Sequence, residues 1–180
     1  MHPTIRLATA VDLSALLDLV QRAYRGDSAR AGWTHEADLL DGQRTDAEAL
    51  ATMLADDRQR VLVAEQHDRL IGCVQVSDQG NGIAYLGMLS VDPGLQAHGL
   101  GRLLIGAAET TAAEAFAARR MEMTVIDQRA ELIAYYERRG YVRTGETRPF
   151  PLDDPRFGLP RRRDLKFAVL MKNLPEGFAP

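Results

Sequence analysis

The chain contains 180 residues, of which 46% are hydrophobic and 26% are charged, and its formal net charge is −3. This size and composition predict a single domain, residues 1–180, with a substantial buried core. The longest apolar runs are far shorter than the roughly 20 residues needed to cross a bilayer, and the N-terminus has no signal-peptide pattern. We therefore expect a cytoplasmic protein without a membrane partner, and the negative charge disfavours nucleic acid as a partner.

The residue types that form disulfides or bind metals are sparse. Cys73 is the only cysteine, which excludes an internal disulfide and a thiolate cluster. Because Cys73 lies between apolar neighbours in a β-rich run, we expect a buried small side chain and not a nucleophile. The four histidines lack any paired ligand spacing, so we expect no metal site.

The N-terminal part of the chain predicts a strand followed by helices. Residues 4–7 are extended in character, and residues 12–24 carry leucines at helical spacing. Residues 27–42 are too irregular for a prediction of secondary structure and could border a substrate cleft, whereas 46–54 again predict a helix.

Three β-rich runs follow, covering 60–65, 69–76 and 83–91. They are separated by the polar residues 66–68 and by QGNG at 79–82, which are typical of turns. Such closely spaced runs predict a meander of antiparallel strands.

The C-terminal half begins with an amphipathic helix pattern, in which apolar residues including Leu103 and Leu104 recur at helical spacing from Leu100 to Thr111. The other predicted elements are a strand at 121–126, a helix at 131–139 ended by Gly140, and strands at 141–147 and 165–171. This order combines a β-meander with a β-α-β unit and predicts a mixed α/β fold. A long proline-rich loop at 148–160 suggests a functional or interface role.

The segment before the central helix predicts an anion-binding loop. A strand ends at Val91, and QAHGLG at 96–101 leads directly into the helix. The first N–H groups of a helix have no intrahelical partner and carry the positive end of its dipole, so they bind anions such as a diphosphate. Gly99 and Gly101 lack the Cβ atoms that would hold phosphates away, and Arg102 adds a positive charge. The alternative is that the two glycines only permit a tight strand-to-helix connection.

Two other nucleotide-binding loops do not match this segment. A Rossmann loop needs GxGxxG with an acidic residue about 20 positions later, and the third glycine position is Leu104 here. A P-loop fails as well, because no glycine is followed by Lys and then Ser or Thr.

QAHGLG at 96–101 matches every specified position of the pattern (Q/R)xxGx(G/A), and in this the sequence resembles the GNAT superfamily of N-acetyltransferases. YYERRGY at 135–141 is similar to the second cofactor-side motif of that family, and the resemblance covers about residues 4–174. It implies a mixed α/β fold with a central, mostly antiparallel, twisted sheet whose splayed strands are flanked by helices. It also implies acetyl-CoA (coenzyme A) as cosubstrate and direct acetyl transfer to a primary amine in a ternary complex.

The resemblance also implies roles for individual residues. The cofactor-binding residues it implies are Leu89 and Val91 beside the pantetheine arm, and Gln96, His98, Gly99, Gly101 and Arg102 at the diphosphate. Tyr136 matches the family tyrosine that protonates the departing thiolate, and the alternative for it or Tyr135 is packing against the sheet. Family members often carry an asparagine near the start of this helix, where this chain has Arg129.

No pattern specifies the amine acceptor, which could be a small molecule or a peptide. Glu36 is a candidate general base or ammonium anchor, with a surface carboxylate as the alternative, and Trp33 and His35 could line the same cleft. Residues 156–163 could close over an acceptor, contact the 3′-phosphate of the cofactor or meet another subunit, so a homodimer stays open. The alternative functions are a catalytically silent acyl-CoA sensor and an unrelated nucleotide-binding domain.

Overall fold

The computed structural model describes residues 3–32, 35–96 and 98–175, and its centre is a seven-stranded sheet. The strand order is β1-β3-β4-β5-β6-β9-β7, and every neighbouring pair is antiparallel except β5 and β6. The strands are β1 (Thr4–Leu7), β3 (Gln59–Gln66), β4 (Arg69–Gly80), β5 (Ile83–Val91), β6 (Arg120–Ile126), β7 (Val142–Pro149) and β9 (Lys166–Asn173). The predicted mixed α/β fold with a mostly antiparallel sheet is confirmed.

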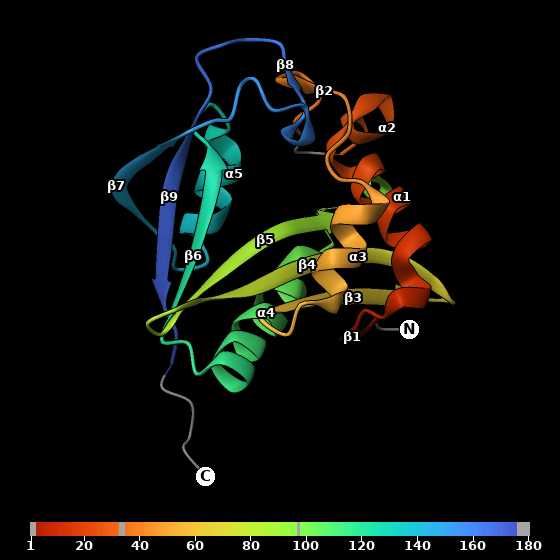
Figure 1. Cartoon of the computed structure of the whole chain (residues 1–180), viewed down its shortest axis with the longest axis vertical. Helices are drawn as coiled ribbons and strands as arrows, with labels where there is room; N and C mark the ends of the chain where they lie inside the picture. Colours follow the sequence, from red (N-terminus) through yellow and green to blue (C-terminus); the bar gives the residue numbers. More distant parts are fainter. Residues whose placement is uncertain (1–2, 33–34, 97, 176–180) are drawn as a thin grey trace.

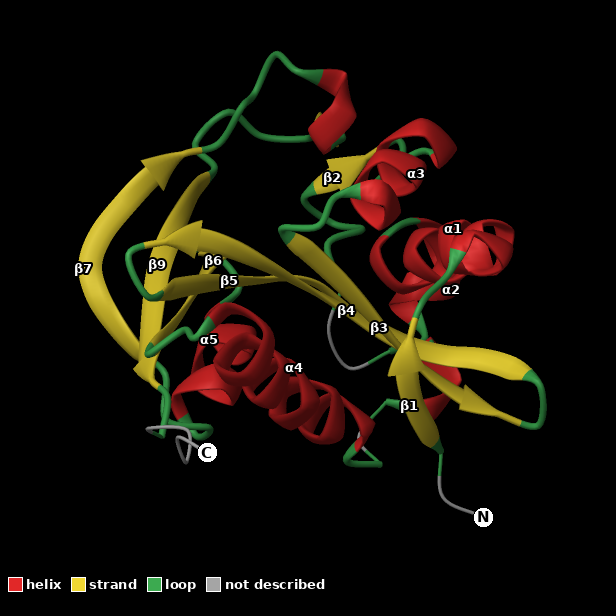
Figure 2. Cartoon of the chain, turned by 60° about the horizontal axis from the view of Figure 1, so that its bottom comes forward, coloured by secondary structure: helices red, strands yellow, loops and turns green. Residues whose placement is uncertain are grey.

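Helices cover both faces of the sheet (Figure 2). The helices are α1 (Leu13–Tyr24), α2 (Gly26–Arg30), α3 (Ala47–Ala55), α4 (Leu100–Phe116) and α5 (Ala130–Glu137). On one face, Leu104 of α4 and Ile133 of α5 belong to the same buried cluster as Leu62 of β3. On the other face, Leu16 of α1 packs in a second cluster with Val63 of β3. Because both faces are covered there, β3 and β4 contain continuous buried runs, whereas β5 and most of β6 alternate between buried and less buried residues.

The helix α4 differs from its prediction in one residue. Leu103 was expected on the apolar face, but it is 47% exposed. The buried residues of α4 are Leu100, Leu104, Ile105, Ala108 and Ala112, most of them four positions apart. A stripe with this spacing follows one side of a helix, and Leu103 lies just outside it.

The strands β5 and β6 separate along their length, as the family resemblance implies (Figure 1). They pair in parallel only through residues 83–85 and 120–122. Beyond this point β6 stays paired with β9 as far as Ile126, while β5 stays with β4. The sheet therefore opens between its two halves, and the end of β5 near Val91 faces space that a strand would otherwise fill.

Two segments far apart in the sequence meet above this opening. β2 (Leu40–Asp41) pairs with β8 (Leu159–Pro160), and the buried side chains of Leu40, Phe150 and Ile126 form a third small core. Sequence patterns did not predict this pair, because two-residue strands are too short to show a periodicity. No helix in the described part of the chain is long and apolar enough to cross a membrane.

Candidate functional site

The loop between β5 and α4 is held by polar contacts and leaves the start of the helix uncapped. Asp92 accepts a hydrogen bond from the Gly94 backbone N–H at 3.1 Å, and its other oxygen lies 2.8 Å from an Arg69 nitrogen. Gly99 precedes α4 with a φ of 83°, in the left-handed region that favours glycine. No side chain of the described residues caps α4. Its first N–H groups are therefore available to an anion or to water.

The two glycines of this loop are needed for different reasons. A Cβ on Gly99 would meet no described atom within 4 Å, so its requirement is conformational. A Cβ on Gly101 would lie 2.6 Å from the Tyr135 hydroxyl, so Gly101 permits a close approach between α4 and α5. The Arg139 guanidinium carbon lies 3.3 Å from the centre of the Tyr135 ring and holds that ring in place. The space beside Gly101 is thus filled by a contact between helices, and the role of both glycines in binding phosphates stays a prediction.

The Gln96 side chain packs against the protein. Its amide nitrogen donates to the Val91 carbonyl at 3.4 Å, and a Cβ on Gly32 would lie 2.3 Å from its amide oxygen. The His98 and Arg102 side chains are exposed, with His98 Nδ1 2.8 Å from the Gln96 carbonyl. Binding of the diphosphate by these three side chains stays a prediction.

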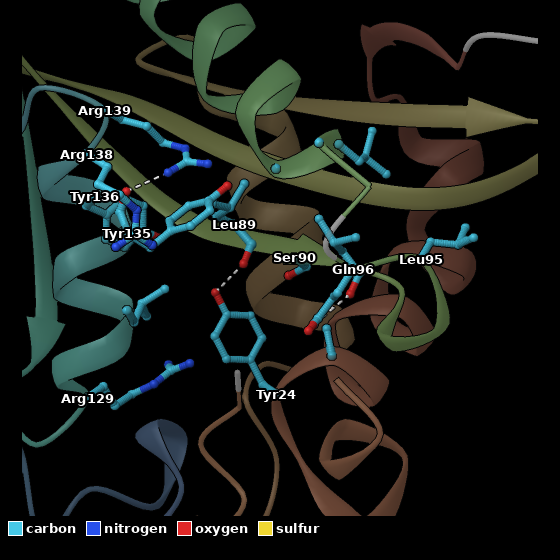
Figure 3. Close-up of a pocket in the computed structure, with 16 residues that line it drawn as sticks. Tyr24, Leu89, Ser90, Leu95, Gln96, Arg129, Tyr135, Tyr136, Arg138 and Arg139 are labelled. Atoms are coloured by element: carbon cyan, nitrogen blue, oxygen red, sulfur yellow. Dashed lines mark hydrogen bonds between the residues drawn. The ribbon is translucent and has the colours of Figure 1, made fainter. Parts of the chain in front are cut away.

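A cavity of about 350 Å³ lies between the start of α4, the length of α5 and the end of β5 (Figure 3). Its lining includes six of the nine predicted site residues, namely Leu89, Val91, Gln96, Gly99, Gly101 and Tyr136. Arg138 and Arg139 add positive charge to the lining. An elongated ligand with an anionic end matches a cavity that begins at a helix N-terminus and carries additional cations.

The strand β5 is irregular where it borders this cavity. Its register with β4 passes from Gly87 opposite Gln75 to Ser90 opposite Cys73, so two residues of β5 face one of β4. Met88 in this interval has a φ of 51°. These features define a β-bulge, which interrupts the ladder beside the cavity that Leu89 lines.

Tyr136 lies where this cavity meets a second one. Its side chain is nearly buried, and its ring contacts the rings of Tyr135 and Tyr141 edge-on, with centroids 5.5 and 6.1 Å apart. Tyr136 nevertheless lines both cavities, so packing and access to a ligand are combined in one residue. Burial raises the pKa of Tyr136, so its hydroxyl stays protonated at neutral pH.

The second cavity, of about 320 Å³, occupies the opening between β5 and β6. The residues it shares with the first cavity are Tyr24, Leu89, Arg129, Leu132 and Tyr136. Much of its lining is apolar or aromatic, and this part includes Leu40, Met53, Tyr85, Phe150, Phe157 and Phe167. Its charged lining consists of Arg25, Glu36, Arg44 and Arg129. Two ligands approaching from the two cavities would therefore meet beside Tyr136.

Glu36 is held in this cavity by two arginines. It forms a short ion pair with Arg25 and a 3.2 Å ion pair with Arg129, which stands where the family often has asparagine. Burial opposes ionisation of Glu36, but the charges of Arg129 and Arg25 prevail and hold its pKa below the ordinary value. The surface-carboxylate alternative is wrong, because the Glu36 side chain is only 12% exposed. A lowered pKa makes Glu36 a weak proton acceptor.

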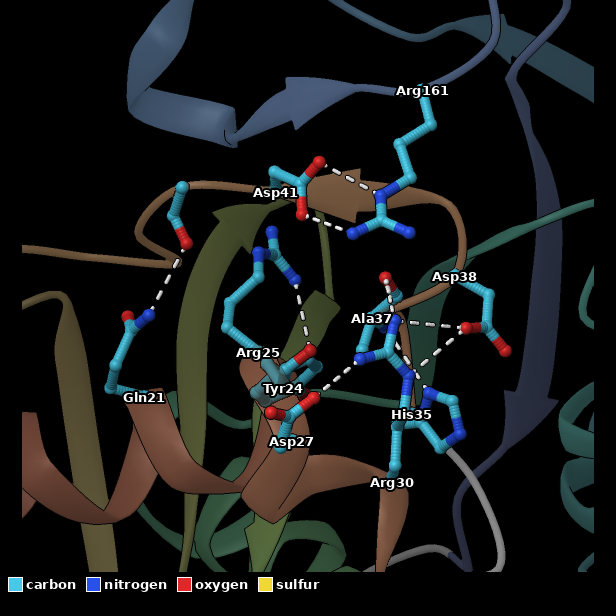
Figure 4. Close-up of polar contacts among 11 residues, drawn as sticks. Gln21, Tyr24, Arg25, Asp27, Arg30, His35, Ala37, Asp38, Asp41 and Arg161 are labelled. Carbon is cyan, nitrogen blue, oxygen red and sulfur yellow. Dashed lines mark hydrogen bonds and ion pairs between the residues drawn. The ribbon is translucent and has the colours of Figure 1, made fainter.

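The segments that were expected to surround an acceptor lie over the second cavity. Asp41 and Arg161 join them through an ion pair of 2.6 Å (Figure 4). The Arg25 guanidinium also lies 3.4 Å from the Phe157 carbonyl, to which it donates a hydrogen bond. Phe157 of the segment 156–163 thus lines the second cavity, while the role of the segment toward an acceptor stays a prediction. His35 lies in this region, its Nδ1 accepting from the Ala37 N–H at 3.2 Å, while Trp33 lies outside the described residues.

Sequence reasoning missed several residues of the site, among them three polar ones at the second cavity. Tyr24, Arg25 and Arg44 all line the second cavity. Tyr24 and Arg25 stand at the end of a leucine-rich helix and Arg44 in an irregular segment, where the local pattern does not distinguish them from surface residues. Arg25 is only 3% exposed. Its burial depends on the ion pair with Glu36, which lies 11 residues away in a segment without a predicted structure.

Comparisons with known proteins agree with this geometry. The model of the acetyltransferase (GNAT) family matches residues 14–141, more than half of the chain. A comparison with curated protein sequences gives no match. Among solved structures, the ribosomal-protein-S18-alanine N-acetyltransferase from Escherichia coli has a TM-score of 0.71 at 17% identity, over 99% of this chain and 96% of that one.

Two further structures have the same fold. A ribosomal-protein-alanine N-acetyltransferase from Brucella melitensis has a TM-score of 0.71 at 22% identity, over 95% of this chain and 99% of that chain. A putative acetyltransferase from Salmonella typhimurium, solved with its cofactor acetyl-CoA, has a TM-score of 0.69 at 21% identity, over 100% of this chain and 98% of that chain. Identities this low show the fold alone. Together with the family match over residues 14–141, they show that this chain belongs to the acetyltransferase (GNAT) family.

Proposed function

We propose that this protein is an N-acetyltransferase that moves an acetyl group from acetyl-CoA to a primary amine. One observation carries the proposal: two cavities meet at Tyr136, one beginning at an uncapped helix N-terminus and the other in the opening between β5 and β6. Direct transfer in a ternary complex needs such a pair of sites that converge on one reacting centre.

The first cavity fits acetyl-CoA by the chemistry of its lining. The uncapped N-terminus of α4 suits a diphosphate, and Arg138 and Arg139 add cations for further phosphate charge. Leu89 and Val91, on the irregular part of β5, would lie beside the pantetheine arm. When bound, acetyl-CoA supplies the acetyl thioester. The Salmonella typhimurium structure with acetyl-CoA supports this use of the fold.

In this proposal the residues of the chain position and protonate. Backbone N–H groups at the bulge near Leu89 polarise the acetyl carbonyl, where negative charge develops as the amine nitrogen attacks. Tyr136 donates its phenolic proton to the sulfur as the carbon–sulfur bond breaks, and the proton that the amine nitrogen loses returns the Tyr136 phenolate to its protonated form. Burial raises the pKa of Tyr136 and makes this donation harder, while the charge of Arg129 lowers that pKa and opposes the effect.

For Glu36 we propose a positioning role. Its ion pairs with Arg25 and Arg129 set the shape and charge of the acceptor cavity. The alternative role for this carboxylate is that of a general base, and the pH dependence of a Glu36→Gln variant separates the two. If Glu36 is a general base, the turnover rate of the unaltered protein should fall at acid pH as Glu36 becomes protonated, and this fall should be absent in Glu36→Gln.

The proposed function is tested by release of free thiol from acetyl-CoA in the presence of an amine panel containing amino acids, amino acid amides, spermidine and an N-terminal alanine peptide. Thiol release that depends on one of these amines, with acetylated product seen by mass spectrometry, is the expected result. Tight acetyl-CoA binding without amine-dependent thiol release would contradict the enzyme and favour a sensor.

A further inference from the structure

The acceptor cavity has an unbalanced charge. Among its described lining residues three are arginines, Arg25, Arg44 and Arg129, and one is acidic, Glu36. Glu36 forms ion pairs with Arg25 and Arg129, which leaves the group of three with one net positive charge. Arg44 contributes another, because no carboxylate of the described residues lies within ion-pair distance of its guanidinium. Buried or half-buried charges of one sign are costly without a counter-ion.

Arg44 is placed close to the reacting centre. Its guanidinium carbon lies 5.0 Å from the centre of the Tyr24 ring, in a cation–π arrangement. Tyr24 in turn donates a hydrogen bond to Leu89 at the bulge of β5. The Arg44 backbone N–H is held by the Gln21 side chain at 3.1 Å, which anchors the start of the side chain. A planar guanidinium in a fixed position suits a carboxylate, which it can bind through two parallel hydrogen bonds.

We infer that the acceptor of this enzyme is a small amine that also carries a carboxylate, in the manner of an α-amino acid, and that Arg44 binds the carboxylate. This inference rests on the proposed function and names the substrate class of the same site. The rest of the lining, with Phe150, Phe167 and Met53, selects an apolar side chain on the acceptor. The cavity volume of about 320 Å³ suits a small molecule.

The same charges assist the chemistry. A cationic environment disfavours the ammonium form of the acceptor, so more of it is present as the neutral amine that attacks the thioester. The carboxylate of the acceptor provides the attraction that a bare ammonium would lack. A polyamine such as spermidine carries only positive charge and is repelled by this lining.

The inference is tested with paired ligands that differ only at the carboxylate. Phenylalanine and phenylalaninamide are titrated into the protein saturated with coenzyme A, with binding measured by calorimetry, and both are then assayed as acceptors with acetyl-CoA. We expect the dissociation constant of phenylalanine to be lower than that of the amide by about 10-fold or more, which is the effect of one charge-assisted contact. Spermidine is expected to bind more weakly than either.

Variants of Arg44 assign the preference to this residue. In Arg44→Gln the two ligands should bind with similar affinity, through loss of phenylalanine binding and not gain of amide binding. Arg44→Lys keeps the charge without the planar fork and should restore part of the preference. Arg163→Gln is the matched control, because Arg163 is 70% exposed, pairs with Asp153 and lines neither cavity. It should leave the preference unchanged.

The outcomes separate this inference from the proposed function. Equal or tighter binding of the amide, no detectable binding of phenylalanine, or an unaltered preference in Arg44→Gln would overturn the carboxylate assignment, even if another amine is acetylated. Selective binding of phenylalanine that depends on Arg44, without thiol release from acetyl-CoA, would uphold the assignment and contradict the N-acetyltransferase proposal instead.

Discussion

The Tyr24 hydroxyl donates a hydrogen bond of 2.7 Å to the backbone carbonyl of Leu89, and this contact ties the end of α1 to the bulge of β5. Burial raises the pKa of Tyr24 to about 12, so the hydroxyl remains a donor at neutral pH. Both residues line the two cavities at the place where they meet. The helix α1 packs on the face of the sheet opposite to α4 and α5. It therefore positions the backbone of β5 that borders the proposed thioester.

Removing this hydroxyl should affect both stability and cofactor binding. Tyr24→Phe leaves the Leu89 carbonyl without its donor, which we expect to cost about 1–3 kcal/mol in the free energy of unfolding, measured in urea. Acetyl-CoA affinity should fall as well, because the bulge loses its anchor. Tyr85→Phe is the comparison, since it removes another 2.7 Å hydroxyl contact, to Thr124, without touching Leu89. If acetyl-CoA affinity falls equally in the two variants, the Tyr24 contact has no special role.

The role of Tyr136 predicts a change in turnover with little change in cofactor affinity. Tyr136→Phe keeps the ring packing but removes the proposed proton donor, so kcat should fall about 100-fold, within the usual range for general acid catalysis. Acetyl-CoA affinity, measured by calorimetry, should be unchanged.

Tyr141→Phe provides the control for Tyr136. Tyr141 belongs to the same aromatic cluster, and its hydroxyl donates to Glu109 at 2.9 Å, but it lines neither cavity. This variant should lower the free energy of unfolding and preserve kcat. An unchanged kcat in Tyr136→Phe, with a verified amine substrate, would reject the acid role.

The contact between Gly101 and Tyr135 predicts a cofactor-binding defect from a single methyl group. In Gly101→Ala the new Cβ displaces the Tyr135 hydroxyl, from which it would lie 2.6 Å away, and this alters the cavity beside the helix N-terminus. The acetyl-CoA dissociation constant, measured by calorimetry, should rise about 10-fold or more, the effect of one lost charge-assisted hydrogen bond.

Gly106→Ala is the matched variant on the same helix. A Cβ there meets no described atom within 4 Å, so the substitution should only stabilise α4, by about 0.5–1 kcal/mol, and leave the dissociation constant as it is. Similar dissociation constants for the two variants would contradict the proposed closeness of α5 to the binding loop.

Glu36 should stabilise the fold in a pH-dependent manner. Glu36→Gln leaves two buried arginines without their carboxylate, which we expect to cost about 3–5 kcal/mol at pH 7. Because the pKa of Glu36 is lower in the folded protein than its ordinary value of 4.5, this stabilisation is full above that value and is lost as the pH falls through the folded pKa.

Urea unfolding of both proteins at several pH values between about 7 and 3 measures this effect, with the difference between them shrinking at the acid end. Asp153→Asn, in an exposed ion pair with Arg163, is the control and should show no measurable loss at any pH. A constant difference across the whole range would mean that the Glu36 charge does not stabilise the fold.

The sequence by itself determined the family, most of the elements and several residues that line the first cavity. QAHGLG and YYERRGY are contiguous, and the chemistry of a loop that leads into a helix N-terminus is local, so residues such as Gly99, Gly101 and Tyr136 could be named from their neighbours. The strand and helix periodicities were likewise local. The loop at 27–42 showed no such pattern, and its helix α2 and strand β2 were not predicted.

Only the tertiary structure decided the lining of the second cavity. Arg25, Arg44 and Arg129 come together from three separate segments, and the pairing of β2 with β8 joins residues about 120 positions apart. Whether a charged side chain is exposed or buried against a counter-ion depends on such long-range contacts, which leave no periodic signal in the chain. The charge of the acceptor cavity, and with it the class of amine that we infer, is therefore a property of the folded protein.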